Sequence, residues 1–154
     1  MKIVHALIVK SLAESLLVSA LAVGFYLKTF PPTFQGWGEA TSNQIAGWAV
    51  DQADQSRPLT VQLFVDGNLI SGAVANLARP DIVLSGWARD ASHGYAFAVP
   101  GLSAGVHEAR VFVLHQGVGN RKTLQLVGDP IPFSVDEQGT FHDLTNRPAP
   151  RGAR

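Results

Sequence analysis

Residues that could carry out chemistry are scattered along this chain rather than grouped. The aspartates nearly all stand beside Gly, Pro or Gln, where Asp side chains commonly cap turns; they are Asp51, Asp54, Asp66, Asp81 and Asp90. Glycoside hydrolysis needs two carboxylates held at a defined separation, and nothing in this spacing marks such a pair. We therefore interpret the aspartates as turn residues.

Serine and histidine give no stronger signal for catalysis. Ser85 and Ser103 lack the Gly-x-Ser-x-Gly context of a nucleophile elbow. His93, His107 and His115 do not form a metal-binding spacing such as His-x-x-x-His. With no cysteine, a thiolate metal site and covalent haem attachment are excluded. The sequence predicts a protein that is not an enzyme, with no catalytic residues, no metal and no cofactor.

The three tryptophans share one local pattern, Gly-Trp followed by a small residue and an acid. The three copies are Gly36-Trp37-Gly38-Glu39, Gly47-Trp48-Ala49-Val50-Asp51 and Gly86-Trp87-Ala88-Arg89-Asp90. Apolar neighbours such as Ile45 and Val50 favour a structural interpretation, in which each Trp fills the core and Gly permits close backbone approach. The alternative is an aromatic platform of Trp37, Trp48 and Trp87 that stacks on sugar rings.

Period-two alternation and turn residues predict a β domain over residues 33–136. The clearest case is 59–65, which runs into Asp66-Gly67, a strong hairpin signal. Further candidate strands are 35–40, 44–50, 68–70, 82–87, 95–99, 107–115, 122–127 and 131–135. This spacing favours a mainly β fold, an antiparallel immunoglobulin-like sandwich of seven to eight strands, with a small barrel as the second choice.

Five motifs follow one another within residues 35–135: Gly47-Trp48-Ala49-x-Asp51, Val61-x-Leu63-x-Val65-Asp66-Gly67, Ala75-x-x-x-Arg79-Pro80-Asp81, His93-Gly94-Tyr95-x-Phe97 and Leu102-x-x-Gly105-x-His107. The series resembles a β-sandwich module of bacterial secreted and envelope proteins. The resemblance implies an immunoglobulin-like fold and an extracytoplasmic location, and it implies no catalytic residues. Such modules are sometimes attached to glycosyltransferases or glycoside hydrolases, which suggests glycan affinity or a spacer role.

Residues 1–32 carry a separate signal. An apolar run from 11 to 30 follows Lys2 and Lys10 and precedes Pro31-Pro32, which predicts one membrane-spanning helix. The alternative is a cleaved signal peptide, with Ala20-Leu21-Ala22 as its processing site, but Glu14 interrupts the apolar region that a signal peptide requires. The basic residues ahead of the run predict a cytoplasmic N-terminus and a periplasmic β domain, anchored in the bacterial inner membrane.

Small residues on the predicted helix could pack against another helix. Ser15 and Ser19 lie four residues apart, as do Ala20 and Gly24 on an adjacent face. Small side chains at this spacing let two helices approach closely. A plain lipid-facing anchor with accidental serines is the alternative.

The charge distribution and the C-terminus point to a protein partner. Residues 31–136 hold six basic and nine acidic residues, a net charge of −3 that offers no basic face for nucleic acid. Residues 137–154 have no apolar period and form a predicted extended Pro/Arg-rich tail. We expect its arginines to bind a partner subunit through charge-assisted hydrogen bonds; they are Arg147, Arg151 and Arg154.

Two functions follow from these expectations. The first is a non-catalytic, membrane-anchored accessory subunit of a larger bacterial membrane complex, with the bilayer and other subunits as its partners. Its plan of one helix, one sandwich and a tail is similar to that of small accessory subunits of photosynthetic reaction-centre–antenna or respiratory assemblies. The alternative is a membrane-tethered carbohydrate-binding module of the cell envelope, with glycan as its ligand.

Overall fold

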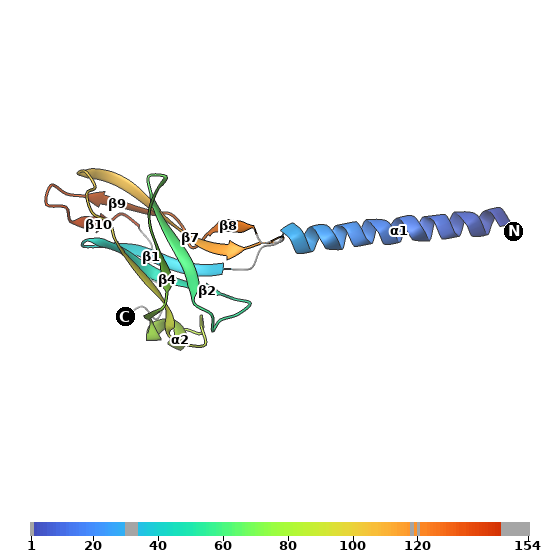
Figure 1. Cartoon of the computed structure of the whole chain (residues 1–154), viewed down its shortest axis with the longest axis horizontal. Coiled ribbons are helices and arrows are strands. Elements are labelled where there is room, and N and C mark those ends of the chain that lie inside the picture. Colours follow the sequence, from blue (N-terminus) through green and yellow to red (C-terminus); the bar gives the residue numbers. More distant parts are fainter. Residues whose placement is uncertain (1, 30–33, 118, 120, 146–154) are drawn as a thin grey trace. The chain divides into compact units, whose positions relative to one another are not determined.

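A computed structural model describes residues 2–29, 34–117, 119 and 121–145. The chain divides into two compact units, residues 1–31 and residues 32–154. The first contains helix α1 and the second contains two β-sheets with a short helix, α2 (Figure 1).

Helix α1 spans Lys2–Thr29 and begins nine residues before the predicted apolar run. Leucine, alanine and other good helix formers dominate it, and it contains no proline. Lys10 Nζ and Glu14 Oε1, one helical turn apart, are separated by 3.7 Å, and both side chains are exposed. Such an exposed pair contributes only a few tenths of a kcal/mol to helix stability.

The expectation that residues 11–30 span a membrane is not upheld. Across the part of the chain that the structure describes, no helix is long and apolar enough to cross a bilayer. Charged Lys10 and Glu14, together with the serines at 11, 15 and 19, interrupt the apolar character of α1.

The second unit is a β-sandwich of two antiparallel sheets, in which ten strands lie among the described residues. The strands are β1 (Phe34–Thr41), β2 (Gln44–Asp51), β3 (Leu59–Val65), β4 (Asn68–Ala75), β5 (Leu77–Ala78), β6 (Ser92–Ala98), β7 (Gly105–Gln116), β8 (Lys122–Leu126), β9 (Ile131–Val135) and β10 (Phe141–Asp143). One sheet has the order β1-β2-β6-β5, and the other has the order β10-β9-β7-β3-β4, with β8 also paired to β7.

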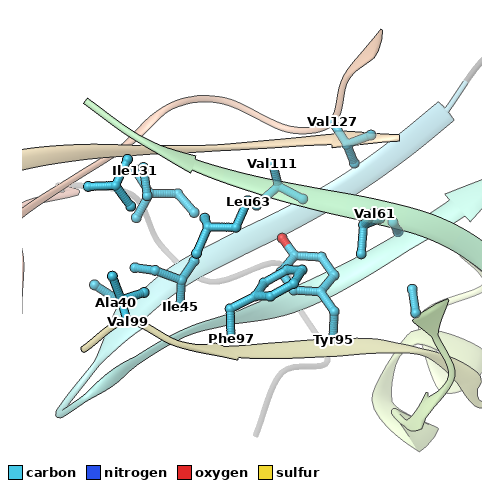
Figure 2. Close-up of a cluster of buried hydrophobic side chains, with 14 of the residues drawn as sticks. Ala40, Ile45, Val61, Leu63, Tyr95, Phe97, Val99, Val111, Val127 and Ile131 are labelled. Atoms are coloured by element: carbon cyan, nitrogen blue, oxygen red, sulfur yellow. The ribbon is translucent and has the colours of Figure 1, made fainter. Parts of the chain in front are cut away.

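One core joins the two sheets. Along β3, residues 59, 61, 63 and 65 are buried, whereas the residues between them are exposed or half-buried, as the alternation predicted. Val61 and Leu63 pack with Ile45 and Phe97 of the opposite sheet (Figure 2). The mainly β, antiparallel sandwich predicted from the sequence is therefore confirmed at this level.

Two glycines on β1 and β2 are required by the core beneath them. A Cβ on Gly47 would collide with the Trp37 carbonyl oxygen and would lie 2.5 Å from the Tyr95 hydroxyl oxygen. A Cβ on Gly36 would collide with Cγ1 of Val127. The expectation that glycine permits close approach next to tryptophan is confirmed at both positions.

The segment predicted as strand 82–87 is instead helix α2 (Pro80–Leu84) and a following turn. Pro80 occupies the first turn of the helix, where its fixed φ angle suits a helix and its missing N–H costs nothing. The apolar run Ile82-Val83-Leu84 resembled a strand, but only Ile82 is buried. Short apolar runs do not distinguish a helix from a strand.

The strand count exceeds the predicted seven to eight because β5 and β10 are too short to show a period. Strand β10 lies within the predicted tail of residues 137–154 and pairs with β9. Phe141 is buried, and its N–H donates to the Ser42 carbonyl oxygen at 2.9 Å. Asp143 also accepts a hydrogen bond from the Ala40 N–H at 2.9 Å. Residues 141–143 are therefore part of the sandwich.

The predicted Asp66-Gly67 hairpin joins β3 to β4, with both residues at positive φ, 51° and 80°. Asp66 also bridges to β7: its Oδ2 lies 2.7 Å from Nδ1 of His107, and its Oδ1 accepts from the Glu108 N–H at 3.0 Å. Nε2 of His107 faces the Ser103 carbonyl oxygen at 2.9 Å. Both ring nitrogens thus face acceptors, which favours the doubly protonated imidazolium.

The Asp66–His107 contact predicts a pH-dependent part of the stability. Hydrogen bonding to Asp66 raises the pKa of His107 above 6.5, and the same contact lowers the pKa of Asp66 below 3.8. The contribution of His107 to the free energy of unfolding is fully present below about pH 6.5 and is lost as the pH rises through the pKa of His107 in the folded protein. The contribution of Asp66 is present above about pH 3.8 and is lost as the pH falls through the pKa of Asp66 in the folded protein. The contact is strongest between these limits.

In His107→Gln, we expect the fall in melting temperature above pH 6.5 to become shallower, by about a few degrees at most because the pair is partly exposed. Thermal melts from pH 4 to pH 9 measure this. The matched control is His115→Gln, since His115 contacts the Thr123 hydroxyl rather than a carboxylate. Equal pH profiles for wild type and His107→Gln would contradict the assignment.

A second prediction concerns the crowded glycine on β2. Gly47→Ala should lower the free energy of unfolding by about 1–3 kcal/mol or more, because the backbone carbonyl of Trp37 cannot yield without breaking the sheet. Gly72→Ala on β4 is the matched control, since its nearest neighbours would lie 3.6 Å from the new Cβ. Urea unfolding of both variants measures the difference, and equal stabilities would refute the crowding.

Candidate functional site

Two of the three tryptophans form a cross-strand pair on the outer face of the β1–β2 hairpin. Trp37 and Trp48 are direct register partners. Ile45 and Ala49 of β2 face the main core, whereas Trp48 and Val50, in the alternate phase, join a second buried cluster. Because strand side chains alternate between faces, this second cluster lies on the far side of the sheet.

The second cluster is small and depends on α2. It contains Trp48, Val50, Ile82 and Ala88, with Trp37 packed against it. Trp48 is only 3% exposed. The prediction that Trp48 is a buried structural residue is therefore confirmed, although it fills a satellite cluster rather than the space between the sheets.

Trp87 differs from the other two because it lies in the connection between α2 and β6. Gly86 has φ +76°, and the Trp87 N–H donates to the Ile82 carbonyl oxygen at 2.9 Å. The Trp87 ring lies 5.8 Å from that of Trp48 between centroids, with the planes 35° apart. Because 37% of Trp87 stays exposed, the prediction that it is a strand residue filling the core is wrong.

An ion pair braces the start of this connection. Arg79 donates to both carboxylate oxygens of Asp81, from Nε at 2.8 Å and from Nη2 at 2.7 Å. These hydrogen bonds lower the pKa of Asp81 below its ordinary value. The Arg79 N–H also donates to the Ala91 carbonyl oxygen at 2.7 Å, which ties the two ends of the connection together. The Arg79–Asp81 pair therefore braces the connection from α2 to β6.

The three tryptophans share a surface pocket of about 490 Å³. Its other walls include Gln35 of β1 and two residues from the far end of the chain, Leu126 and Asp129. Gly128, at φ +69°, lets the segment after β8 approach β1, since a Cβ there would lie 2.9 Å from the Gly36 carbonyl oxygen. The pocket therefore lies where β1 of one sheet meets the segment that follows β8 of the other.

Gln35 lines the pocket and carries a buried polar atom. Its side-chain Oε1 is buried, and it accepts no hydrogen bond from the described residues. A buried acceptor without a donor costs about 1–3 kcal/mol. Sequence reasoning missed Gln35, Leu126 and Asp129, because only the fold brings these distant positions beside the tryptophans.

The helix-packing candidates are placed only in part. Ser15, Ser19 and Ala20 lie on α1 and are exposed. Gly24 lies in α1, but its surroundings fall outside the described residues. The tail candidates Arg147, Arg151 and Arg154 fall outside them as well.

Among residues 2–29, 34–117, 119 and 121–145, no group of three or more His, Asp or Glu side chains could hold a metal ion. Comparisons of the chain with protein families, with curated proteins and with solved structures find no match.

The two tryptophans should differ in their effect on stability. Trp48→Ala removes a side chain that is 3% exposed and should cost about 3–5 kcal/mol of unfolding free energy. Trp87→Ala should cost clearly less, because more than a third of the ring is already in solvent. Chemical unfolding of the two variants side by side measures the contrast, and equal losses would show that Trp87 is as integral to the fold as Trp48.

Proposed function

We propose that this chain is a non-catalytic accessory subunit of a larger bacterial membrane complex and that helix α1 joins it to the other subunits. The supporting observation is the surface of α1. Nine large apolar side chains on it are 52–75% exposed: Val4, Ile8, Val9, Leu12, Leu16, Leu17, Val18, Leu21 and Val23. An apolar surface of this extent is unfavourable in water and marks an interaction site.

The apolar residues surround the helix rather than forming one stripe. Leu16, Leu17 and Val18 are consecutive, so they point in directions about 100° apart. A helix that is apolar on all sides requires apolar surroundings on all sides. One partner surface would cover only part of α1, which favours a site among several helices.

The polar residues of α1 favour protein over lipid as the neighbour. Lys10, Glu14 and the serines at 11, 15 and 19 would need hydrogen-bond partners in a dry environment, and neighbouring helices supply them whereas acyl chains do not. Ser15–Ser19 and Ala20–Gly24 are the faces where another helix could approach most closely. The proposal therefore does not require α1 to cross a bilayer alone.

In this proposal the N-terminus faces the cytoplasm and the sandwich lies in the periplasm. We assign the sandwich to the immunoglobulin-like type, and Arg147, Arg151 and Arg154 to carboxylates of a neighbouring subunit. The carbohydrate-binding function remains a second candidate, supported by a different observation, the tryptophan pocket.

Purification of the tagged full chain from its native membranes in a mild detergent tests the assembly. We expect other membrane proteins to co-purify in fixed proportion, and their identification by mass spectrometry shows whether the assembly is a photosynthetic reaction-centre–antenna complex, a respiratory complex or another. A lone monomer, recovered at low salt, would overturn the proposal.

A charged substitution on α1 tests its role directly. Leu16→Glu should weaken association by roughly tenfold or more, since burying one leucine is worth about 1.5–3 kcal/mol, while the melting temperature of the sandwich stays unchanged. Val106→Glu is the matched control, because Val106 is equally exposed, at 74% against 75%, but lies on β7. Retention of the partners by Leu16→Glu would show that α1 is not the joining element.

A further inference from the structure

We infer that the pocket formed by Trp37, Trp48 and Trp87 binds a glycan, and specifically a β-linked pyranose whose ring hydroxyls are equatorial. This inference rests on the second candidate function, carbohydrate binding, and gives it a site and a class of sugar; it concerns the sandwich alone and is independent of the assembly proposed for α1.

The exposed ring of Trp87 provides the first contact. A tryptophan that is 37% exposed beside a hollow is hydrophobic surface that the fold leaves uncovered. An equatorial pyranose presents axial C–H groups on its faces, and these pack against the negative face of an indole ring. The ring of Trp48 packs against the ring of Trp87, with 5.8 Å between the two centroids, and so supports it.

The pocket also carries polar side chains that suit a sugar. Gln35 and Asp129 both line it, and an amide and a carboxylate are groups that can hydrogen-bond ring hydroxyls. Gln35 Oε1 is buried and accepts no hydrogen bond from the described residues. If the Gln35 side chain turns toward the hollow, a sugar hydroxyl can donate to this oxygen and remove the cost of leaving it unpaired. A purely apolar ligand would leave that cost in place.

Size and stability also fit a preformed sugar site. A volume of 490 Å³ lies within the ordinary range for small-ligand pockets, about 300–1,000 Å³. The walls are held before any ligand arrives: Trp48 by the second buried cluster, the Trp87 connection by the Arg79–Asp81 pair, and the segment after β8 by Gly128. Little ordering would accompany binding, which benefits affinity.

The test uses the full chain in mild detergent, titrated with cellotetraose and with the β-1,4-linked tetramer of N-acetylglucosamine. Tryptophan fluorescence and calorimetry report binding. We expect at least one of the two probes to bind and to shift the tryptophan emission. Trp87→Ala should weaken that binding roughly tenfold, which corresponds to about 1.4 kcal/mol.

Two further variants separate ligand contact from folding. Gln35→Leu keeps a similar volume, removes the orphaned acceptor and should weaken binding without lowering the melting temperature. Leu84→Ala is the matched control, because Leu84 is 87% exposed on α2 and lies outside the pocket walls; its affinity should equal that of the wild type.

Two outcomes would overturn the inference. The first is the absence of binding of both probes into the millimolar range, and the second is undiminished binding by Trp87→Ala and Gln35→Leu. Neither outcome bears on the assembly proposed for α1.

Discussion

The sandwich depends on one crowded contact, the Tyr95 hydroxyl beneath the β1–β2 hairpin. Tyr95 is 2% exposed, and its hydroxyl donates to the Trp37 carbonyl oxygen at 3.2 Å. Burial raises the pKa of Tyr95, so the hydroxyl stays protonated and remains a donor. A buried hydroxyl without this acceptor would cost about 1–3 kcal/mol, and the space that it fills explains why Gly38 and Gly47 carry no side chain there.

This contact also accounts for the outer face of the same hairpin. Because the inner positions at 36, 38 and 47 are glycines, β1 and β2 place no side chain in the main core at these three positions. The outer positions next to them carry large side chains, Trp37 and Trp48, and α2 with Ile82 covers part of them. Helix α2 does not cover Trp87, so the pocket beside the three tryptophans stays open to solvent. The pocket is therefore a consequence of how the hairpin distributes bulk between its two faces.

The sequence was informative where local patterns decide the structure. The alternation in β3 and the Asp66-Gly67 turn both rest on near neighbours, and the structure agrees with each. It was uninformative where position depends on distant segments. Trp87 shares its motif with Trp48, yet it follows a helix, because Pro80 begins α2 and Gly86 turns the chain out of it. No local pattern indicated that Gln35 and Asp129 line the same pocket, because 94 positions separate them in the sequence. The apolar run of 11–30 predicted a helix correctly, but among the described residues no helix is long and apolar enough to cross a bilayer, so the predicted span was not upheld.

The two units place different demands on their surroundings. The sandwich closes its own core, because its buried residues come from both sheets. Helix α1 differs: the nine large apolar side chains described on it are 52–75% exposed, and burial of such side chains by a neighbour would be favourable. The walls of the tryptophan pocket are instead held by contacts within the sandwich itself, Trp48 by the second buried cluster and the segment after β8 by the close approach at Gly128.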